Sequence, residues 1–185
     1  NNTITNPALI VSSGFSLKEN IDFVKDVLDY VYIFSLPSAL PYLDFKGIRP
    51  DFVMAVDPGY GTFYHLAKYQ KGTDLITTLN VTPSVFNIDN YNTLFFSYDN
   101  YLEKIIYDDY DIVNSCAEGS VIFNLLRVVK EIGFDTAILV GQDFGFKENR
   151  GHIYEGSFER EFIARSNYLR PLEHLIKDGE CKKDL

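Results

Sequence analysis

The stretch from Glu118 to Phe146, EGSVIFNLLRVVKEIGFDTAILVGQDFGF, contains a loop, a helix, a turn, a strand and a second loop. Ser120 is a favourable N-cap, because its hydroxyl can accept a hydrogen bond from a free backbone N–H of the first turn. Apolar residues recur at helical spacing from Val121 to Ile132, and Gly133 can take the positive φ that ends a helix. The stretch therefore predicts a helix that leads directly into a strand.

The strand of this stretch, residues 136–140, is a short apolar run without polar alternation. Such a run is typical of a strand that is buried on both faces of a parallel sheet. It is followed by Gly141, Gln142 and Asp143, so polar groups are expected at its carboxyl end. Because ligands of open α/β sheets bind beyond the carboxyl ends of the strands, we expect a cleft there.

Strands and helices alternate along the rest of the chain. The predicted strands are residues 8–12, 30–36, 52–56, 74–79 and 93–98, and the predicted helices are 18–29, 64–69 and 158–176, the last kinked or split by Pro171. This alternation predicts an α/β, Rossmann-like fold with a mostly parallel sheet flanked by helices. Residues 1–185 suit a single domain, which could be a piece of a longer protein.

Composition excludes some classes of partner. The formal net charge of −9 argues against nucleic acid or an anionic membrane as the main partner. No apolar run is long enough to span a bilayer. Cys116 and Cys181 follow no metal-binding or redox spacing, so we expect a reducing, cytoplasmic setting.

The sequence leaves open the roles of three residues that follow predicted strands. Gly14 follows the first strand and precedes a helix, where backbone N–H groups favour phosphate, although a plain β–α connection explains it as well. Asp57 follows the third strand and could contact a ligand or cap the next helix. Asp143 could accept hydrogen bonds from a ligand, or it could fix the adjoining loop by accepting backbone N–H bonds.

The segment 98–111 is rich in tyrosine and aspartate. A metal site at Asp108, Asp109 and Asp111 is one interpretation, but neighbouring aspartates on one element do not converge, so a solvated acidic loop is favoured. His65 lies in the predicted helix 64–69 and is expected at the surface.

Three pieces in fixed order resemble a known family. They are Ser13-Gly14-Phe15-Ser16-Leu17, then Gly47-Ile48-Arg49-Pro50-Asp51 with Asp57-Pro58, and then Glu118-Gly119-Ser120-Val121 with Gly141-Gln142-Asp143-Phe144. Together they resemble the DUF115, or 6-hydroxymethylpterin pyrophosphokinase-like, family, which includes the motility accessory factors (Maf) of flagellin glycosylation. The resemblance covers roughly residues 8–152.

The same pattern is more distantly similar to the bacterial sialyltransferases that use CMP-sialic acid, whose fold is a variant of the GT-A type. That likeness implies a metal-independent cytidine nucleotide site, with Gly14, Ser16, Ser120, Gly141 and Asp143 around the nucleotide. Asp57, Gly119 and Gln142, at a strand end, a helix start and a strand end, complete the set of expected binding residues. His152 follows the Asp-Phe strand end, where the sialyltransferases place a catalytic histidine. The chain departs from the family pattern at Phe15, Pro37 and Glu118, where proline, aspartate and glycine are usual.

The resemblance implies an enzyme that transfers a CMP-linked nonulosonic sugar to a protein or glycan acceptor such as flagellin, with no prosthetic group. A histidine suits the base that such a transfer needs. Two alternatives stay open. One is a Mg²⁺-dependent pterin pyrophosphokinase, for which Asp57 and Asp51 are the available carboxylates. The other is a non-catalytic nucleotide-sugar-binding module of a surface-glycosylation protein, which Phe15 and Glu118 favour.

Overall fold

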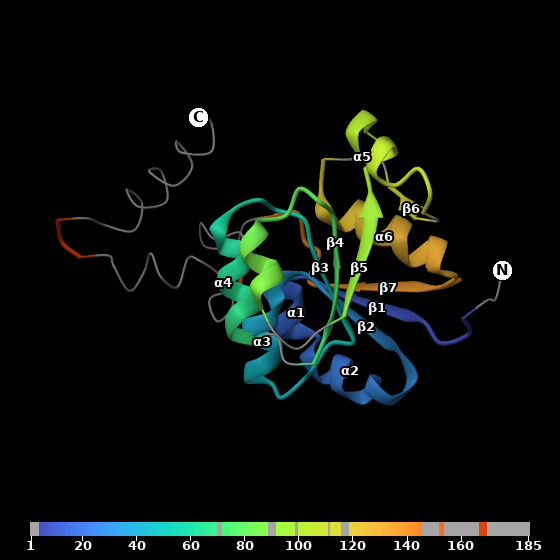
Figure 1. Ribbon diagram of the computed structural model, residues 1–185. Coiled ribbons are helices and arrows are strands. Elements are labelled where there is room, and N and C mark those ends of the chain that lie inside the picture. Colours follow the sequence, from blue (N-terminus) through green and yellow to red (C-terminus); the bar gives the residue numbers. More distant parts are fainter. Residues whose placement is uncertain are drawn as a thin grey trace.

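The computed structural model describes residues 4–69, 72–88, 92–98, 100–110, 112–115, 119–145, 152–153 and 167–169. The strands of this part form a seven-stranded sheet in the order β6-β5-β4-β3-β2-β1-β7, and neighbouring strands pair in parallel. Figure 1 shows helices on both faces of the sheet. The predicted α/β, Rossmann-like architecture is therefore confirmed.

The strands are β1 (Ala8–Val11), β2 (Tyr32–Ser35), β3 (Phe52–Ala55), β4 (Asp74–Thr77), β5 (Thr93–Ser97), β6 (Val113–Asn114) and β7 (Ala137–Val140). The helices are α1 (Phe15–Glu19), α2 (Ile21–Asp26), α3 (Leu40–Phe45), α4 (Tyr60–Tyr69), α5 (Tyr101–Ile106) and α6 (Val121–Ile132), with short 3₁₀ turns at Leu28–Tyr30, Pro37–Ala39 and Pro83–Asn87. The six strands expected from the sequence are present. The two-residue strand β6 was not predicted, because it is too short to show a pattern.

The core lies in two layers, one on each face of the sheet. On β1, Ala8 and Ile10 pack with α6, whereas Leu9 and Val11 pack with α1, α2 and α3. A third cluster joins β3 and β4 to α4 on the same face as α3. Because successive side chains of a strand point to opposite faces, the completely buried β1 holds both layers together.

Helix α6 follows the prediction from its apolar spacing. Its inward residues are buried against the sheet, and these are Ile122, Leu125, Val128 and Val129. Gly133 ends the helix with a φ of 115°, and its N–H bonds to the carbonyl of Lys130 at 3.1 Å. Ser120 occupies the N-cap position as expected, but its hydroxyl makes no capping bond to the described helix.

The expected burial of the last strand on both faces is wrong. β7 pairs with β1 and stands at one end of the sheet as the described residues form it. Ile138 and Val140 pack on the α1 face, but Ala137 and Leu139 face the other side, where Leu139 is 46% exposed. The apolar run is therefore explained by one covered face and an apolar but exposed second face.

Three smaller expectations also need correction. The predicted helix 18–29 begins earlier, at Phe15, and breaks at Asn20, whose side-chain amide donates to the carbonyl of Ser16 at 2.8 Å. α4 begins at Tyr60, four residues earlier than predicted, and His65 is buried instead of lying at the surface. The expected acidic loop contains α5. Asp111, part of the metal interpretation, lies outside the described residues, as does the predicted helix 158–176.

Helix α6 offers a direct test of this packing. We expect Leu125→Ala to lower the free energy of unfolding by about 2–5 kcal/mol, because it removes a completely buried side chain between α6 and the sheet. Leu102→Ala removes the same atoms from the exposed face of α5 and should change it by less than about 0.5 kcal/mol. Urea denaturation of both variants measures the difference, and equal effects would contradict the burial described here.

Candidate functional site

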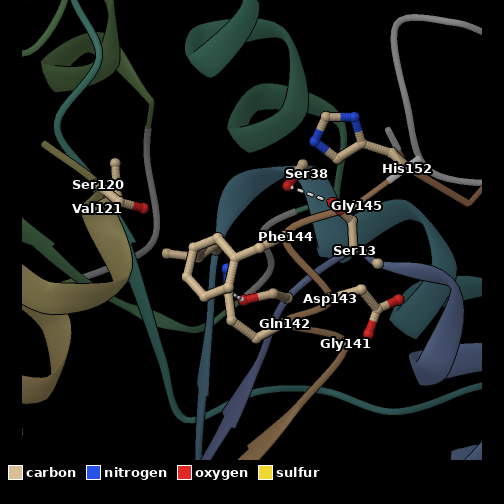
Figure 2. Close-up of a pocket in the computed structure, with 13 residues that line it drawn as sticks. Ser13, Ser38, Ser120, Val121, Gly141, Gln142, Asp143, Phe144, Gly145 and His152 are labelled. Carbon is tan, nitrogen blue, oxygen red and sulfur yellow. Dashed lines mark hydrogen bonds between the residues drawn. The ribbon is translucent and has the colours of Figure 1, made fainter. Parts of the chain in front are cut away.

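The order of the strands reverses at β1. From β1 the chain builds β2 to β6 on one side, and α6 then returns it to the opposite side of β1 as β7. In open α/β sheets, a crevice forms at the carboxyl ends of the strands where the strand order reverses. A cavity of about 260 Å³ lies there, lined by Ser12, Ser13, Gly14, Leu36, Ser38, Ser120, Val121, Gly141, Gln142, Asp143, Phe144, Gly145 and His152 (Figure 2).

Gly14 and Gly141 let the two loops touch at the base of the cavity. The N–H of Gly14 donates to the carbonyl of Gly141 at 2.7 Å, and Gly141 directly follows Val140, the last β7 residue that pairs with β1. A Cβ on Gly14 would lie 2.5 Å from that carbonyl oxygen, and a Cβ on Gly141 would lie 2.0 Å from the carbonyl oxygen of Ser12. Gly141 also has a φ of +77°. Both positions therefore need glycine for close backbone approach.

Asp143 fixes the loop after β7 to the start of α1. Its Oδ2 accepts the N–H of Ser16 at 2.8 Å, and its Oδ1 accepts the hydroxyl of the same residue. A carboxylate in this place satisfies a free N–H of the first helical turn and stabilises the positive end of the helix. Of the two roles that the sequence left open, the geometry shows loop fixation.

Two further side-chain hydrogen bonds join residues that line the cavity. Ser12 donates to Oε1 of Gln142 at 2.7 Å. Ser13 donates to the hydroxyl of Ser38 at 2.8 Å (Figure 2). These bonds join the loops after β1, β2 and β7. Sequence reasoning missed Ser12, Ser13 and Ser38, although each lies at or just beyond the carboxyl end of a predicted strand. Applying the strand-end rule to the second strand would have found Ser38.

His152 reaches the cavity from a later part of the chain. The N–H of the next residue, Ile153, donates to the carbonyl of Ser13 at 2.9 Å, and the Ile153 side chain is buried among the residues that pack on α1. These two contacts hold His152 beside the loop after β1. Figure 2 shows Ser120 and Val121 on one side of the cavity and Ser13, Ser38 and His152 on the other.

Phe144 closes part of the cavity with a strained backbone. Its φ is +47°, a region that a bulky side chain rarely adopts, and its ring stacks on Phe123 of α6 with centroids 6.2 Å apart. Phe144 remains 69% exposed despite this contact. The stacking joins the loop after β7 to the first turns of α6.

The structure gathers most, but not all, of the predicted site residues. Gly14, Ser120, Gly141, Gln142, Asp143 and His152 line the cavity. Ser16 stands behind Asp143, and Gly119 and Asp57 are not among the described lining residues. Asp57 follows β3, and its Oδ1 accepts the N–H of Gly59 at 2.7 Å just before α4. Asp57 thus organises the start of α4.

The fold defines a Rossmann-like α/β protein with a cavity at the point where the strand order reverses. The chain belongs to the family described as 6-hydroxymethylpterin diphosphokinase MptE-like, whose profile matches residues 1–149. The expected DUF115 membership is thereby confirmed. Comparison with curated proteins gives no match.

Among solved structures, the chain is similar to the Maf glycosyltransferase from Magnetospirillum magneticum AMB-1, with a TM-score of 0.66 and 22% sequence identity. The alignment covers 80% of this chain and 24% of that chain, so this chain spans about a quarter of its length. This likeness shows a shared fold. Within the described residues, no helix combines the length and the apolar composition that crossing a bilayer requires.

Gly119 and Gly141 have the same φ of +77°, so substitutions at these two positions distinguish the cost of backbone strain from the cost of steric crowding. A Cβ on Gly119 meets nothing within 4 Å, so we expect Gly119→Ala to lower the free energy of unfolding by about 1–2 kcal/mol. Gly141→Ala should lower it by about 1–3 kcal/mol more, because the added methyl overlaps the carbonyl of Ser12. Thermal and urea denaturation compare the two variants, and equal destabilisation would refute the close β1–β7 contact.

The bonds between Asp143 and Ser16 can be divided by a double-mutant cycle. Asp143→Ala removes both acceptors and should lower the free energy of unfolding by about 1–2 kcal/mol. Ser16→Ala removes the hydroxyl but keeps the backbone N–H, so its effect should be smaller. In the double variant the loss of the hydroxyl should add almost nothing to Asp143→Ala. Strictly additive effects would show that the two side chains do not interact in solution.

Proposed function

We propose that this domain binds a nucleotide-activated sugar, a CMP-linked nonulosonic sugar, and transfers it to a protein or glycan acceptor. The observation that carries this proposal is the cavity where the strand order reverses, lined by the first residues of α6 and by the serines of the loops after β1 and β2. A site of this kind suits a ligand with one phosphate and several hydroxyl groups.

The donors that face the cavity support phosphate binding. α6 has twelve residues, and the N–H groups of its first turn carry the partial positive charge of the helix dipole. The hydroxyls of Ser38 and Ser120 can add hydrogen bonds to phosphate or sugar oxygens. The described lining residues include neither Lys nor Arg, so neutral donors from these residues would hold the phosphate.

In the proposed reaction, the bond between the sugar carbon and the phosphate oxygen breaks, and its electron pair leaves with CMP. The acceptor hydroxyl oxygen forms the new bond to the sugar carbon through an oxocarbenium-like transition state. Its proton passes to the neutral imidazole of His152, which lines the cavity opposite Ser120 (Figure 2). The first turn of α6 stabilises the charge that develops on the phosphate.

The comparison supports transfer, because the similar solved structure is named as a glycosyltransferase. The family resemblance makes flagellin the acceptor to test first. We propose the cytoplasm as the setting, since Cys116 and Cys181 are spaced for neither metal nor redox chemistry.

The family's description favours a second candidate, a pterin diphosphokinase that uses ATP and Mg²⁺. Its metal would need carboxylates beside the phosphates. Oδ1 of Asp57 accepts the N–H of Gly59, and Oδ2 of Asp51 accepts the N–H of Ile33, both at 2.7 Å. Neither aspartate lines the described cavity. These contacts make the glycosyltransferase the better-supported function.

Calorimetric titration with CMP in the presence of EDTA tests the binding step. Ser38→Ala and Ser120→Ala should each weaken binding roughly tenfold, the effect of losing one hydrogen bond to a charged group. Ser84→Ala, in the turn Pro83–Asn87 away from the cavity, is the matched control and should bind as the wild type does. Binding of ATP with Mg²⁺ but not of CMP would replace this proposal with the diphosphokinase.

The role of His152 is tested by separating binding from transfer. His152→Gln should lower the rate of sugar transfer about 10²–10⁴-fold, because the acceptor proton loses its base. Its affinity for CMP should stay within about twofold of the wild type, since the proposed phosphate donors lie on α6 and the serine loops. Single-turnover transfer from a CMP-linked sugar and calorimetry give the two values. CMP binding without transfer by the wild type would favour the non-catalytic module.

A further inference from the structure

Helix α5 has an inverted pattern of burial. Four of its six residues are large apolar side chains that face solvent: Tyr101 (78% exposed), Leu102 (68%), Ile105 (59%) and Ile106 (54%). We call these four the α5 face. The buried residue of the helix is Glu103, a carboxylate. Helices of soluble proteins normally bury the apolar stripe and expose the charge, so this surface needs an explanation.

Polar contacts, and not the apolar residues, hold α5 to the sheet. Oε2 of Glu103 accepts the N–H of Tyr98 at 2.6 Å and the hydroxyl of Ser97 at 2.8 Å. Oδ1 of Asn100 caps the helix by accepting the N–H of Glu103 at 2.9 Å. Burial, followed by the nearby charge of Glu103, raises the pKa of Tyr98 and of Tyr107. Within the part of the chain that the structure describes, the α5 face is therefore left exposed.

The same contacts connect α5 to the helix that borders the cavity. The carbonyl of Ser97 accepts the N–H of Ser115 at 2.7 Å, and the hydroxyl of Ser115 donates to Oδ1 of Asn124 at 3.0 Å. Ser97, Ser115 and Asn124 are all buried. Since Asn124 lies in the second turn of α6, the α5 face has a fixed position relative to the start of that helix.

Charge limits the class of partner that fits the α5 face. Asp108 and Asp109 follow the helix and are exposed, and the whole chain carries −9. Anionic lipid and nucleic acid are repelled by such a surface, whereas a polypeptide with Lys or Arg beside apolar residues is attracted. Lys104 is the one exposed cation of α5, so the exposed charges of residues 101–109 remain negative in sum.

We propose that the α5 face is a docking site for a polypeptide partner that presents apolar side chains flanked by Lys or Arg. Because the described strands are parallel, α5, which follows β5, lies at the same edge of the sheet as the cavity. Figure 1 shows α5 at the end of β5, projecting beyond the sheet. A docked polypeptide would thus lie along the edge at which the cavity opens.

Fluorescence anisotropy with three synthetic peptides tests the proposal on the full chain. The probe is an amphipathic helical peptide of Leu and Lys, and its matched partners replace Lys by Glu or Leu by Ser. We expect the Leu/Lys peptide to bind roughly tenfold or more tightly than either partner, with affinity falling at high salt. The double variant Leu102→Ser, Ile106→Ser should lose roughly tenfold or more of this affinity.

The control is Phe45→Ser, which removes another large exposed side chain, 70% exposed, from α3. It should bind the Leu/Lys peptide as the wild type does. Equal binding by the double variant, or equal binding of the Glu-containing peptide, would overturn the proposal. A second outcome would also overturn it. If light scattering shows that the wild type is a dimer, that the double variant is a monomer and that no peptide binds, then a second copy of this chain covers the α5 face. Cavity ligands play no part, so a failure of CMP binding leaves this test unaffected.

Discussion

The parallel pairing of β1 with β7 is the contact on which the rest of the structure depends. β1 is buried on both faces and pairs with β2 on one side and β7 on the other. Just beyond this strand pair the two backbones stay in contact. Gly14 and Gly141 make that possible, because each lets one backbone approach the other where a methyl group would not fit. Asp143 then fixes the two loops to each other through Ser16.

Helix α6 makes this pairing possible and also borders the cavity. It carries the chain from β6 at one end of the sheet across to β7 at the other, and its apolar face fills the layer beneath β1, β2 and β3. The polar bonds of Ser115 and Asn124 fix its second turn, while the first turn faces the cavity. Packing and site geometry therefore rest on one helix, and a change that shifts it would alter both.

The sequence predicted what depends on local pattern. Apolar spacing identifies the helix that ends at Gly133, and the residues that follow predicted strands identify Gly14 and Gly141 to Asp143 as neighbours of the cavity. It did not predict properties set by distant parts of the chain. Thr136 to Val140 looks the same whether its second face is covered or exposed, and Asp143 looks the same whether it meets a ligand or Ser16. His65 was expected at the surface, but it is buried by the packing of α4, which the local sequence does not show.

The α5 segment shows why such local reasoning has limits. Its sequence alternates acidic, aromatic and aliphatic residues, and composition alone favoured a solvated loop. The usual burial pattern is inverted in α5, because Glu103 is buried with Ser97 and the aliphatic side chains face solvent. In the chain alone, the exposed apolar side chains gain no free energy from burial, and the hydrogen bonds from Ser97 and Tyr98 offset part of the desolvation of Glu103. A partner that covers these side chains would add the missing burial, while the hydrogen bonds to Glu103 keep the helix oriented for it.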